Sequence, residues 1–171
     1  MSPTQSDPWQ RLGDTLSGRL EARTRGLLAS EFVLLNSEGA EVGRLLIHGP
    51  AGADLEAGDA AARIERVGRS GYKMLSSGTE ILTSAGDATS PKLVSHNRPY
   101  ETSLSLLRNT AEAGPAQHKA TIHIKGGLTN RNYEASFEPD DEPSLPIALF
   151  LIYRLVALRR EAYRTASQQR Q

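Results

Sequence analysis

Most of the chain alternates short apolar runs with turn-forming residues, which is the pattern of a protein built from many short β-strands. Residues 27–35 and 41–47 are two such runs, and the turn-forming residues 36–39 between them predict a β-hairpin. Further runs of strand length follow at residues 61–67, 72–75, 80–84, 92–95, 101–108, 120–125 and 132–138. About nine to eleven strands are expected in all, and no amphipathic helix separates them, so the pattern predicts an antiparallel β-layer rather than βαβ units.

Residues 1–24 are expected to precede this layer as a tail or a short helix. Asp7 and Pro8 suit the N-cap and the first position of a helix. Apolar residues then recur at spacings of three and four, which gives one apolar stripe formed by Trp9, Leu12, Leu16 and Leu20. Glycines interrupt the stripe, so the alternative is a first strand over residues 15–22.

Residues 145–158 differ from the rest of the chain because they are apolar on every side, with Arg154 as their only charge. Acidic residues precede this segment and arginines follow it, in the order that favours a helix dipole, so a helix is predicted. The acidic residues are Glu138, Asp140, Asp141 and Glu142, and the arginines are Arg159, Arg160 and Arg164. We assign the first group to the helix start rather than to a cation site, and the second group to the carbonyl groups of the helix end.

A helix that is apolar on every side has to be enclosed on every side, by lipid or by protein. Residues 145–158 would span about 21 Å as a helix, against about 30 Å for the hydrocarbon core of a bilayer. Arg154 would lie near the middle of that span, at a cost of about 2.5 kcal/mol or more. We therefore expect a central helix enclosed by the β-layer and no transmembrane span, with a membrane anchor over the same residues as the alternative.

This arrangement resembles the tubby-like superfamily, which includes tubby, the plant LURP-one-related proteins and the phospholipid scramblases. The resemblance rests on the early hairpin over residues 31–47, the serial hairpins after it, and the terminal helix over residues 144–163. It implies a mainly β fold, in which an antiparallel β-barrel of short hairpin strands encloses a central hydrophobic C-terminal helix. It also implies a single barrel domain over residues 25–165, with residues 166–171 as a disordered tail.

Members of this superfamily with known functions bind phosphoinositides or act at membranes, and many bacterial members have no established role. This chain lacks the cysteine-rich stretch that carries palmitate, and it contains no acidic calcium loop of the D-x-[DN]-x-[DN]-G type. The resemblance, to a bacterial-type member, therefore implies a fold, with an anionic membrane surface or a protein as the expected partner. It carries no lipid-contacting residue of tubby over to a position in this chain.

Composition narrows the range of functions. The chain has 171 residues, enough for one domain, and its 20 Lys and Arg balance its 20 Asp and Glu. Without surplus positive charge, and with 3 Phe, 1 Trp and 5 Tyr, it is not expected to bind nucleic acid. The absence of cysteine excludes disulfides, zinc ribbons and thiol catalysis. Residues 1–10 lack the basic and apolar regions of a secretory signal, so we expect a cytoplasmic protein, with a position at the membrane periphery as the alternative.

The sequence contains no motif of a familiar catalytic chemistry. The histidines His48, His96, His118 and His123 form neither an H-E-x-x-H motif nor an H-x-H pair, so no metal site is expected. The G-x-S-x-G elbow, the P-loop and the G-x-G-x-x-G fingerprint are all absent. We therefore expect a protein that is not an enzyme and needs no cofactor.

The most suggestive stretch for binding is residues 61–73, which carries the four positive charges of Arg63, Arg66, Arg69 and Lys73. Gly68 and Gly71 expose backbone N–H groups beside Arg69, and guanidinium groups combined with free amides can bind an anion. The alternative interpretation is a solvated strand edge, where positive charges discourage pairing with another strand.

These observations lead to the hypothesis of a non-enzymatic tubby-like domain that binds a ligand or partner, with an anionic phospholipid headgroup as the specific expectation. The alternative is a structural or protein-interaction module without a small-molecule ligand. Such a module would contact its partner through the apolar stripe from Trp9 to Leu20.

Overall fold

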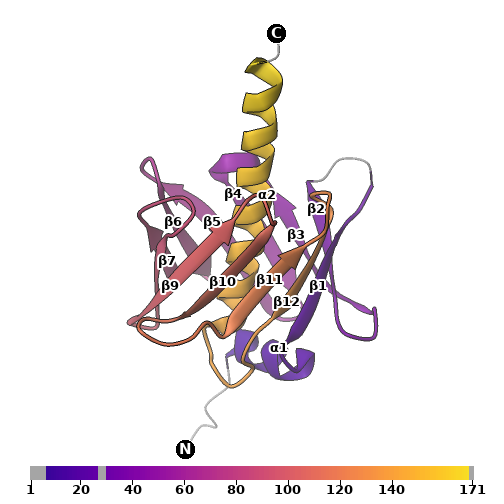
Figure 1. The fold of residues 1–171 in the computed structure, drawn as a ribbon. Helices are drawn as coiled ribbons and strands as arrows, with labels where there is room; N and C mark the ends of the chain where they lie inside the picture. The colour runs from indigo at the N-terminus through magenta and orange to yellow at the C-terminus, as the bar shows by residue number, and fades with distance from the viewer. Residues whose placement is uncertain (1–6, 27–29, 170–171) are drawn as a thin grey trace, which may run out of the picture.

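The twelve strands that the structure describes form one closed antiparallel barrel around a central helix (Figure 1). The structure is a computed structural model, and it describes residues 7–26 and 30–169. The order of the strands around the barrel follows the chain, and β1 (Arg19–Thr24) closes the ring by pairing with β12 (Asn132–Ser136). The fold class expected from the sequence is confirmed.

The other strands are short, and each pairs with the strands that precede and follow it in the chain. They are β2 (Glu31–Leu35), β3 (Glu41–Ile47), β4 (Gly52–Ala57), β5 (Ala60–Val67), β6 (Gly71–Ser76), β7 (Thr79–Ala85), β8 (Lys92–Ser95), β9 (Arg98–Ser105), β10 (Thr110–Pro115) and β11 (Ile122–Gly126). Alternate residues point inward, as in β12, where Tyr133 and Ala135 are buried between exposed neighbours. The turns between strands therefore lie in two sets, one at each end of the barrel.

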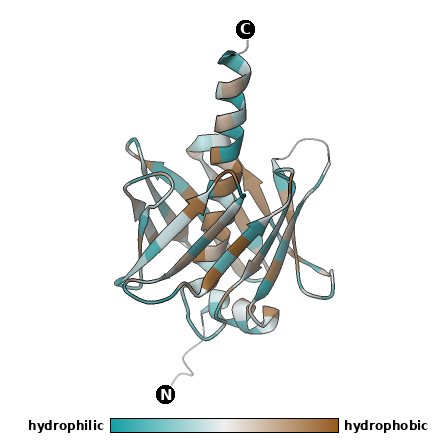
Figure 2. Cartoon of the chain, in the orientation of Figure 1, coloured by the Kyte–Doolittle hydropathy of each residue, from teal (hydrophilic) through white to brown (hydrophobic). Residues whose placement is uncertain are grey.

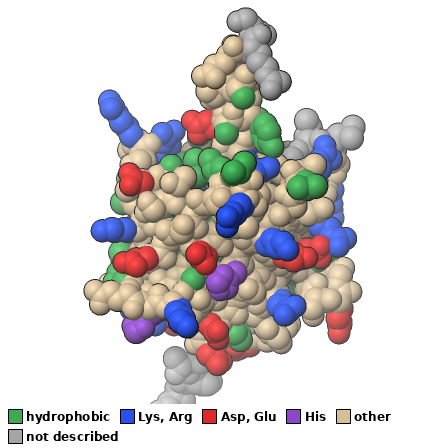
Figure 3. Space-filling view, viewed as in Figure 1, with side chains coloured by type: hydrophobic (Ala, Val, Ile, Leu, Met, Phe, Trp, Pro, Cys, Tyr) green, Lys and Arg blue, Asp and Glu red, His purple; other side chains and the backbone are tan. Residues whose placement is uncertain are grey.

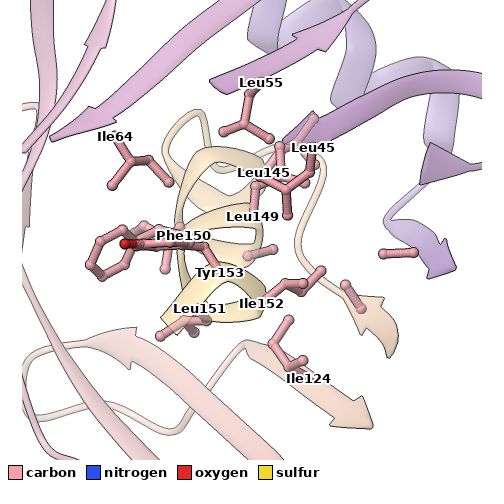
Figure 4. Close-up of a cluster of buried hydrophobic side chains, with 14 of the residues drawn as sticks. Leu45, Leu55, Ile64, Ile124, Leu145, Leu149, Phe150, Leu151, Ile152 and Tyr153 are labelled. Carbon is pink, nitrogen blue, oxygen red and sulfur yellow. The ribbon is translucent and has the colours of Figure 1, made fainter. Parts of the chain in front are cut away.

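The helix α2 (Ser144–Gln169) runs through the barrel and supplies the centre of its core. Its residues 144–157 are buried, and they form a continuous hydrophobic column inside the wall (Figure 2). Leu45, Leu55 and Ile64 of the wall lie around this column (Figure 4). The interpretation of an enclosed helix is confirmed. Across residues 7–26 and 30–169, no helix is both long enough and apolar enough to cross a bilayer.

Small side chains on the inner face of the wall make room for α2. The buried alanines of the strands are Ala22, Ala53, Ala57, Ala60, Ala62, Ala111, Ala113 and Ala135. Because side chains fill the interior of a small barrel, small wall positions alternate with large ones such as Leu45 and Ile64 around the helix. The small positions explain why sequence patterns predicted no strand at β4 or at β10, since both strands are rich in alanine and contain glycine, with Thr110 as their one β-branched residue.

The helix α1 (Pro8–Leu16) covers one end of the barrel, which we call the closed end (Figure 1). It begins where Asp7 and Pro8 predict a helix start. Trp9 and Leu16 are buried in the core, and Trp9 Nε1 donates a hydrogen bond to Ser76 Oγ at 3.0 Å. The expectation that the stripe from Trp9 to Leu20 contacts another protein is wrong, because burial of its apolar side chains closes the barrel instead.

The barrel begins earlier, and α2 ends later, than the sequence patterns suggested. Strand β1 lies before the expected domain start at residue 25, because only two of its side chains are buried and its alternation is short. The helix α2 continues to Gln169, so residues 166–169 are helical rather than a disordered tail, while residues 170–171 lie outside the described residues. The last turns of α2 project beyond the wall at the opposite end, which we call the helix-exit end (Figure 1).

Candidate anion-binding pocket

A pocket of about 340 Å³ lies at the helix-exit end, where α2 passes the turn between β5 and β6 and the short 3-10 turn Gly49–Ala51. Its charged lining consists of Arg66, Arg69, Arg154, Arg160, Arg164 and a single acidic side chain, Glu161. Pro50, Tyr72 and Leu158 contribute uncharged lining. We call this site the arginine pocket.

Arg66, near the end of β5, and Arg69, in the turn between β5 and β6, reach the arginine pocket. Gly68 has a φ of +66°, a conformation that side chains with a Cβ rarely adopt. A Cβ on Gly71 would lie 2.8 Å from the backbone oxygen of Val67, so this position also favours glycine. Arg66 Nη2 donates to the backbone oxygen of Arg69 at 2.5 Å, which orders the turn. The two glycines and the hydrogen bond from Arg66 therefore determine the position of Arg69 in the turn.

Arg154 forms the deepest part of the pocket. It is 8% exposed, and its Nη1 donates to the hydroxyl of Tyr72 at 2.8 Å. The guanidinium carbon lies 4.3 Å from the centre of the Tyr72 ring, in a cation–π arrangement. Tyr72 in turn donates to the backbone oxygen of Pro50 at 3.1 Å. These contacts hold Arg154 at the mouth of the hydrophobic column, and no carboxylate of the described residues pairs with it.

The arginines that follow the apolar part of α2 divide between two sides of the helix. Arg160 and Arg164 are one turn apart and line the pocket, and burial lowers the pKa of Arg160. Arg159 points to the other side, where its Nη1 donates to the backbone oxygen of Leu106 at 2.5 Å. The prediction that these three arginines satisfy the carbonyl groups of the helix end therefore misses the role of two of them, which line the pocket.

Five arginines against one acidic side chain leave the arginine pocket with surplus positive charge. None of its five arginines forms an ion pair with a carboxylate among residues 7–26 and 30–169. A buried charge is costly unless it is paired, and among the described residues Arg154 is compensated by the rings of Tyr72 and Tyr153 and by the Tyr72 hydroxyl group. An anion in this pocket would supply the missing counter-charge.

The four residues of the predicted anion site do not all come together. Arg66 and Arg69 line the pocket, whereas Arg63 and Lys73 lie on the outer wall and pair across strands. Arg63 Nε lies 3.1 Å from Asp54, and Lys73 Nζ lies 3.6 Å from Glu65. The hydrogen bond from His48, followed by that from Arg63, lowers the pKa of Asp54. Strand alternation separates the two pairs, so the structure brings two of the four predicted residues to one pocket, and their binding of an anion stays a prediction.

Sequence reasoning missed the three arginines of α2 as members of this site. They are about ninety residues from Arg66, and only the closure of the barrel brings the two segments together. One signal was available, since Arg154 is the only charge within residues 145–158. A charge in a helix that must be buried has to face an opening or a partner.

A second depression, of about 470 Å³, lies on the outer wall over β1, β11 and β12. Its charged lining mixes both signs, with Arg19, Glu21, Lys125 and Glu134. Lys125 and Glu134 are directly opposite each other in the β11–β12 ladder, where opposite charges compensate. In the part of the chain that the structure describes, no group of three or more His, Asp or Glu side chains is arranged to hold a metal ion.

Comparisons with known proteins support the fold. No protein-family model matches the sequence, and no curated protein matches it. Among solved structures, the barrel is similar to that of an Arabidopsis thaliana protein, AT5G01750, with a TM-score of 0.56 and 12% sequence identity. The similarity covers 80% of this chain and 90% of the plant protein. At this identity the similarity shows a shared fold alone.

Proposed function

We propose that this protein is a non-enzymatic domain of the tubby-like type that binds an anionic ligand in the arginine pocket. The specific ligand that we propose is an anionic phospholipid headgroup. The observation that carries this proposal is the set of five arginines around one pocket, without a carboxylate partner among the described residues. The fold similarity supports the tubby-like assignment only.

The chemistry of the pocket suits a phosphate group. A guanidinium group presents several N–H donors in one plane and binds phosphate oxygens in pairs. Arg69 and Arg164 are exposed at the entrance, whereas Arg154 is buried. An entering anion would pass the exposed arginines and meet a guanidinium group that Tyr72 already holds in place. Charge interactions strengthen with distance from bulk water, so Arg154 is expected to contribute most.

Most of the charged groups of the pocket are guanidinium groups, which bind anions without reacting with them. Guanidinium groups stay protonated and offer neither a nucleophile nor a general base near neutral pH. The Tyr72 hydroxyl is already engaged by Arg154 and by the backbone oxygen of Pro50. These features support a binding role over an enzymatic one.

The chain offers a matched pair of double variants to test this proposal. Arg69→Ala with Arg164→Ala removes two charges from the pocket, while Arg63→Ala with Lys73→Ala removes two charges from the outer wall. Co-sedimentation would compare vesicles of phosphatidylcholine alone with vesicles that also contain phosphatidic acid. We expect binding only to the anionic vesicles, and about tenfold or more weaker binding for the pocket variant alone.

Two results would contradict the lipid version of the proposal. One is equal pelleting, or no pelleting, with the two kinds of vesicle. The other is the same loss of binding in both double variants, which would indicate a diffuse charge effect without a site. If inorganic phosphate binds the pocket while vesicles do not, the ligand is a soluble anion.

A structural or protein-interaction role without a small-molecule ligand is the second candidate function. The observation that favours it is an apolar surface on the other side of α2, away from the arginine pocket. Leu107 and Leu128 are 96% and 99% exposed on that side.

A further inference from the structure

The arginine pocket contains one carboxylate, that of Glu161, among its five arginines. This carboxylate forms no hydrogen bond or ion pair with any residue that the structure describes, although Arg160 precedes it and Arg164 follows one turn later. On the outer wall, acidic and basic side chains are interspersed (Figure 3), and several of them pair across strands. The arginine pocket therefore presents groups of both signs that lack an oppositely charged partner among the described residues.

Glu161 lies on the side of α2 that faces the pocket. It follows Arg154 by seven residues, so the two side chains lie on the same side of the helix, two turns and about 10.5 Å apart along its axis. Side chains of a helix lean towards its N-terminus, so Glu161 leans towards the barrel. Ala157 and Leu158, one turn earlier, line the pocket between the two charges. A ligand on its way to Arg154 therefore passes a carboxylate and an apolar surface.

The mixture of charges narrows the class of ligand. A phosphate group alone would satisfy the arginines, but it would leave Glu161 beside a bound anion, where the two negative charges repel each other. A metal ion does not suit the pocket either, because a hard cation needs several oxygen ligands and the pocket supplies one carboxylate. A primary ammonium group donates to a single carboxylate. If it is attached to a phosphate, the attraction of the phosphate to the arginines offsets their repulsion of the ammonium.

We propose that Glu161 makes the arginine pocket selective for a phosphate compound that also carries a primary ammonium group, as a lipid headgroup or as a free phosphorylated amine. This inference rests on the proposed function, since it requires the arginines to bind the phosphate. The ammonium donates to Glu161, the phosphate lies among the guanidinium groups, and the carbon atoms between them pack on Ala157 and Leu158. Such a ligand pairs with the groups of both signs in the pocket.

Two soluble compounds that differ in one group test this selectivity. Phosphoethanolamine and phosphocholine carry the same phosphate and the same positive charge, but the trimethylated nitrogen of phosphocholine has no N–H to donate. Isothermal titration calorimetry on the full chain would compare both compounds with inorganic phosphate. We expect phosphoethanolamine to bind at least about threefold more tightly than phosphocholine, a modest ratio because Glu161 is exposed.

Glu161→Gln removes the charge and keeps the size of the side chain, and the exposure of Glu161 means that the fold should be unaffected. We expect this variant to bind phosphoethanolamine about threefold or more weakly, and to bind inorganic phosphate more tightly because a repelling charge is lost. A general effect of charge would not produce opposite changes for the two ligands. Glu101→Gln, on the exposed face of β9, is the matched control and should change neither affinity by more than about twofold.

Vesicles distinguish the two sources of the ligand. Phosphatidylserine and phosphatidylglycerol each carry one net negative charge, but only phosphatidylserine carries an ammonium group. Stronger co-sedimentation with vesicles that contain phosphatidylserine, lost in Glu161→Gln, would identify a lipid headgroup as the ligand. A preference confined to the soluble compounds would identify a free phosphorylated amine.

Two results would overturn the inference and leave the arginine pocket as a binding site. One is equal affinity for phosphoethanolamine and phosphocholine together with equal co-sedimentation with the two kinds of vesicle. The other is a similar gain of affinity for all three soluble compounds in Glu161→Gln, which would make Glu161 a repelling charge only. If the wild-type protein binds none of these compounds and neither kind of vesicle, the proposed function fails together with this inference.

Discussion

The two ends of the barrel differ in whether their charged side chains are paired and their apolar side chains are buried. At the closed end, α1 buries Trp9, and Arg98 is 2.7 Å from Asp141, a residue just before α2. The aspartate also accepts from Tyr100, and burial followed by this hydrogen bond raises the pKa of Tyr100 to about 12. At the helix-exit end, five arginines around one pocket lack carboxylate partners among the described residues, and two leucines face solvent.

This difference supports the proposal that one end of the barrel contributes to stability and the other end binds a ligand or partner. Paired charges and buried apolar side chains lower the free energy of the fold itself. Unpaired buried cations and exposed leucines do not, so their retention at one end needs another explanation. Binding provides one, because a ligand or a partner would satisfy the groups that the fold leaves unsatisfied.

The largest expected effect on stability comes from a change in the buried part of α2, the hydrophobic column that connects the two ends of the barrel. Leu151→Asp would place an unpaired carboxylate at a side chain that is fully buried inside the barrel. We expect a loss of several kcal/mol in the free energy of unfolding, enough to prevent folding. Circular dichroism and urea denaturation measure this loss. A soluble variant that unfolds cooperatively with near wild-type stability would contradict the enclosed-helix architecture.

The next prediction compares the loss of stability when an apolar side chain is removed from each end of the barrel. Trp9→Ala removes a buried indole and its hydrogen bond to Ser76, so we expect a cost of about 3 kcal/mol or more. Leu107→Ala removes a side chain that is 96% exposed, and the free energy of unfolding should change by less than about 0.5 kcal/mol. Denaturant midpoints of the two variants check the contrast. Similar costs would mean that the ends do not differ in the way described.

Arg154→Met is expected to separate binding from stability. Replacing a buried cation that has no carboxylate partner with an apolar side chain of similar volume should be neutral or stabilising. Binding of phosphate or anionic vesicles should weaken by at least about tenfold, since the deepest guanidinium is lost. Thermal unfolding and vesicle binding are the paired measurements. Unchanged binding would remove Arg154 from the site.

Alkaline pH is expected to have a smaller effect on stability, through one buried tyrosine at each end of the barrel. Burial raises the pKa of Tyr100 and of Tyr133 from the usual 10.0 to about 12. Because the folded state holds these protons more tightly, their contribution to stability is complete below pH 10 and is lost as the pH rises towards 12. Spectrophotometric titration of tyrosinate would show late-ionising tyrosines in the folded state. Titration of every tyrosine near pH 10 in folded protein would refute this expectation.

The smallest effect is expected for the paired charges of the outer wall. Arg63→Ala removes one partner of Asp54, and both side chains are well exposed. Exposed pairs of this kind contribute about 0 to 1 kcal/mol, so stability should barely change. Chemical denaturation of this variant in low and high salt measures the contribution. A larger cost would show that the wall charges, like those of the closed end, support the fold.

The amino-acid sequence predicts the architecture of the protein more completely than it predicts the candidate binding site. The apolar run of residues 145–158 predicts a buried helix, because its length and its single charge argue against a membrane span. Serial hairpins predict the strands, except where the wall has to be small, as at Ala111 and Ala113 of β10. At those positions an alanine is required by the limited space beside α2, although alanine has low β-propensity. A single sequence does not show how much space each position has.

The site could be predicted only in part because it is assembled across the barrel. Arg66 and Arg69 are recognisable beside the glycines of their turn, but the outward direction of Arg63 and Lys73 depends on strand register. The register pairs these two residues with Asp54 and Glu65 and so removes them from the site. The approach of α2 to the same turn follows from closure of the ring, which local patterns do not encode.

The most direct test of the central claim follows backbone amide resonances while inorganic phosphate is added to the full chain. Gly68 and Gly71 report on the arginine pocket, and Gly58 and Gly78 report on turns at the closed end. We predict saturable shifts at Gly68 and Gly71, no saturable shift at Gly58 and Gly78, and loss of the first shifts in Arg154→Met. Shifts of equal size at both ends, or no saturable shift at Gly68 and Gly71, would contradict the assignment of the arginine pocket as the binding site.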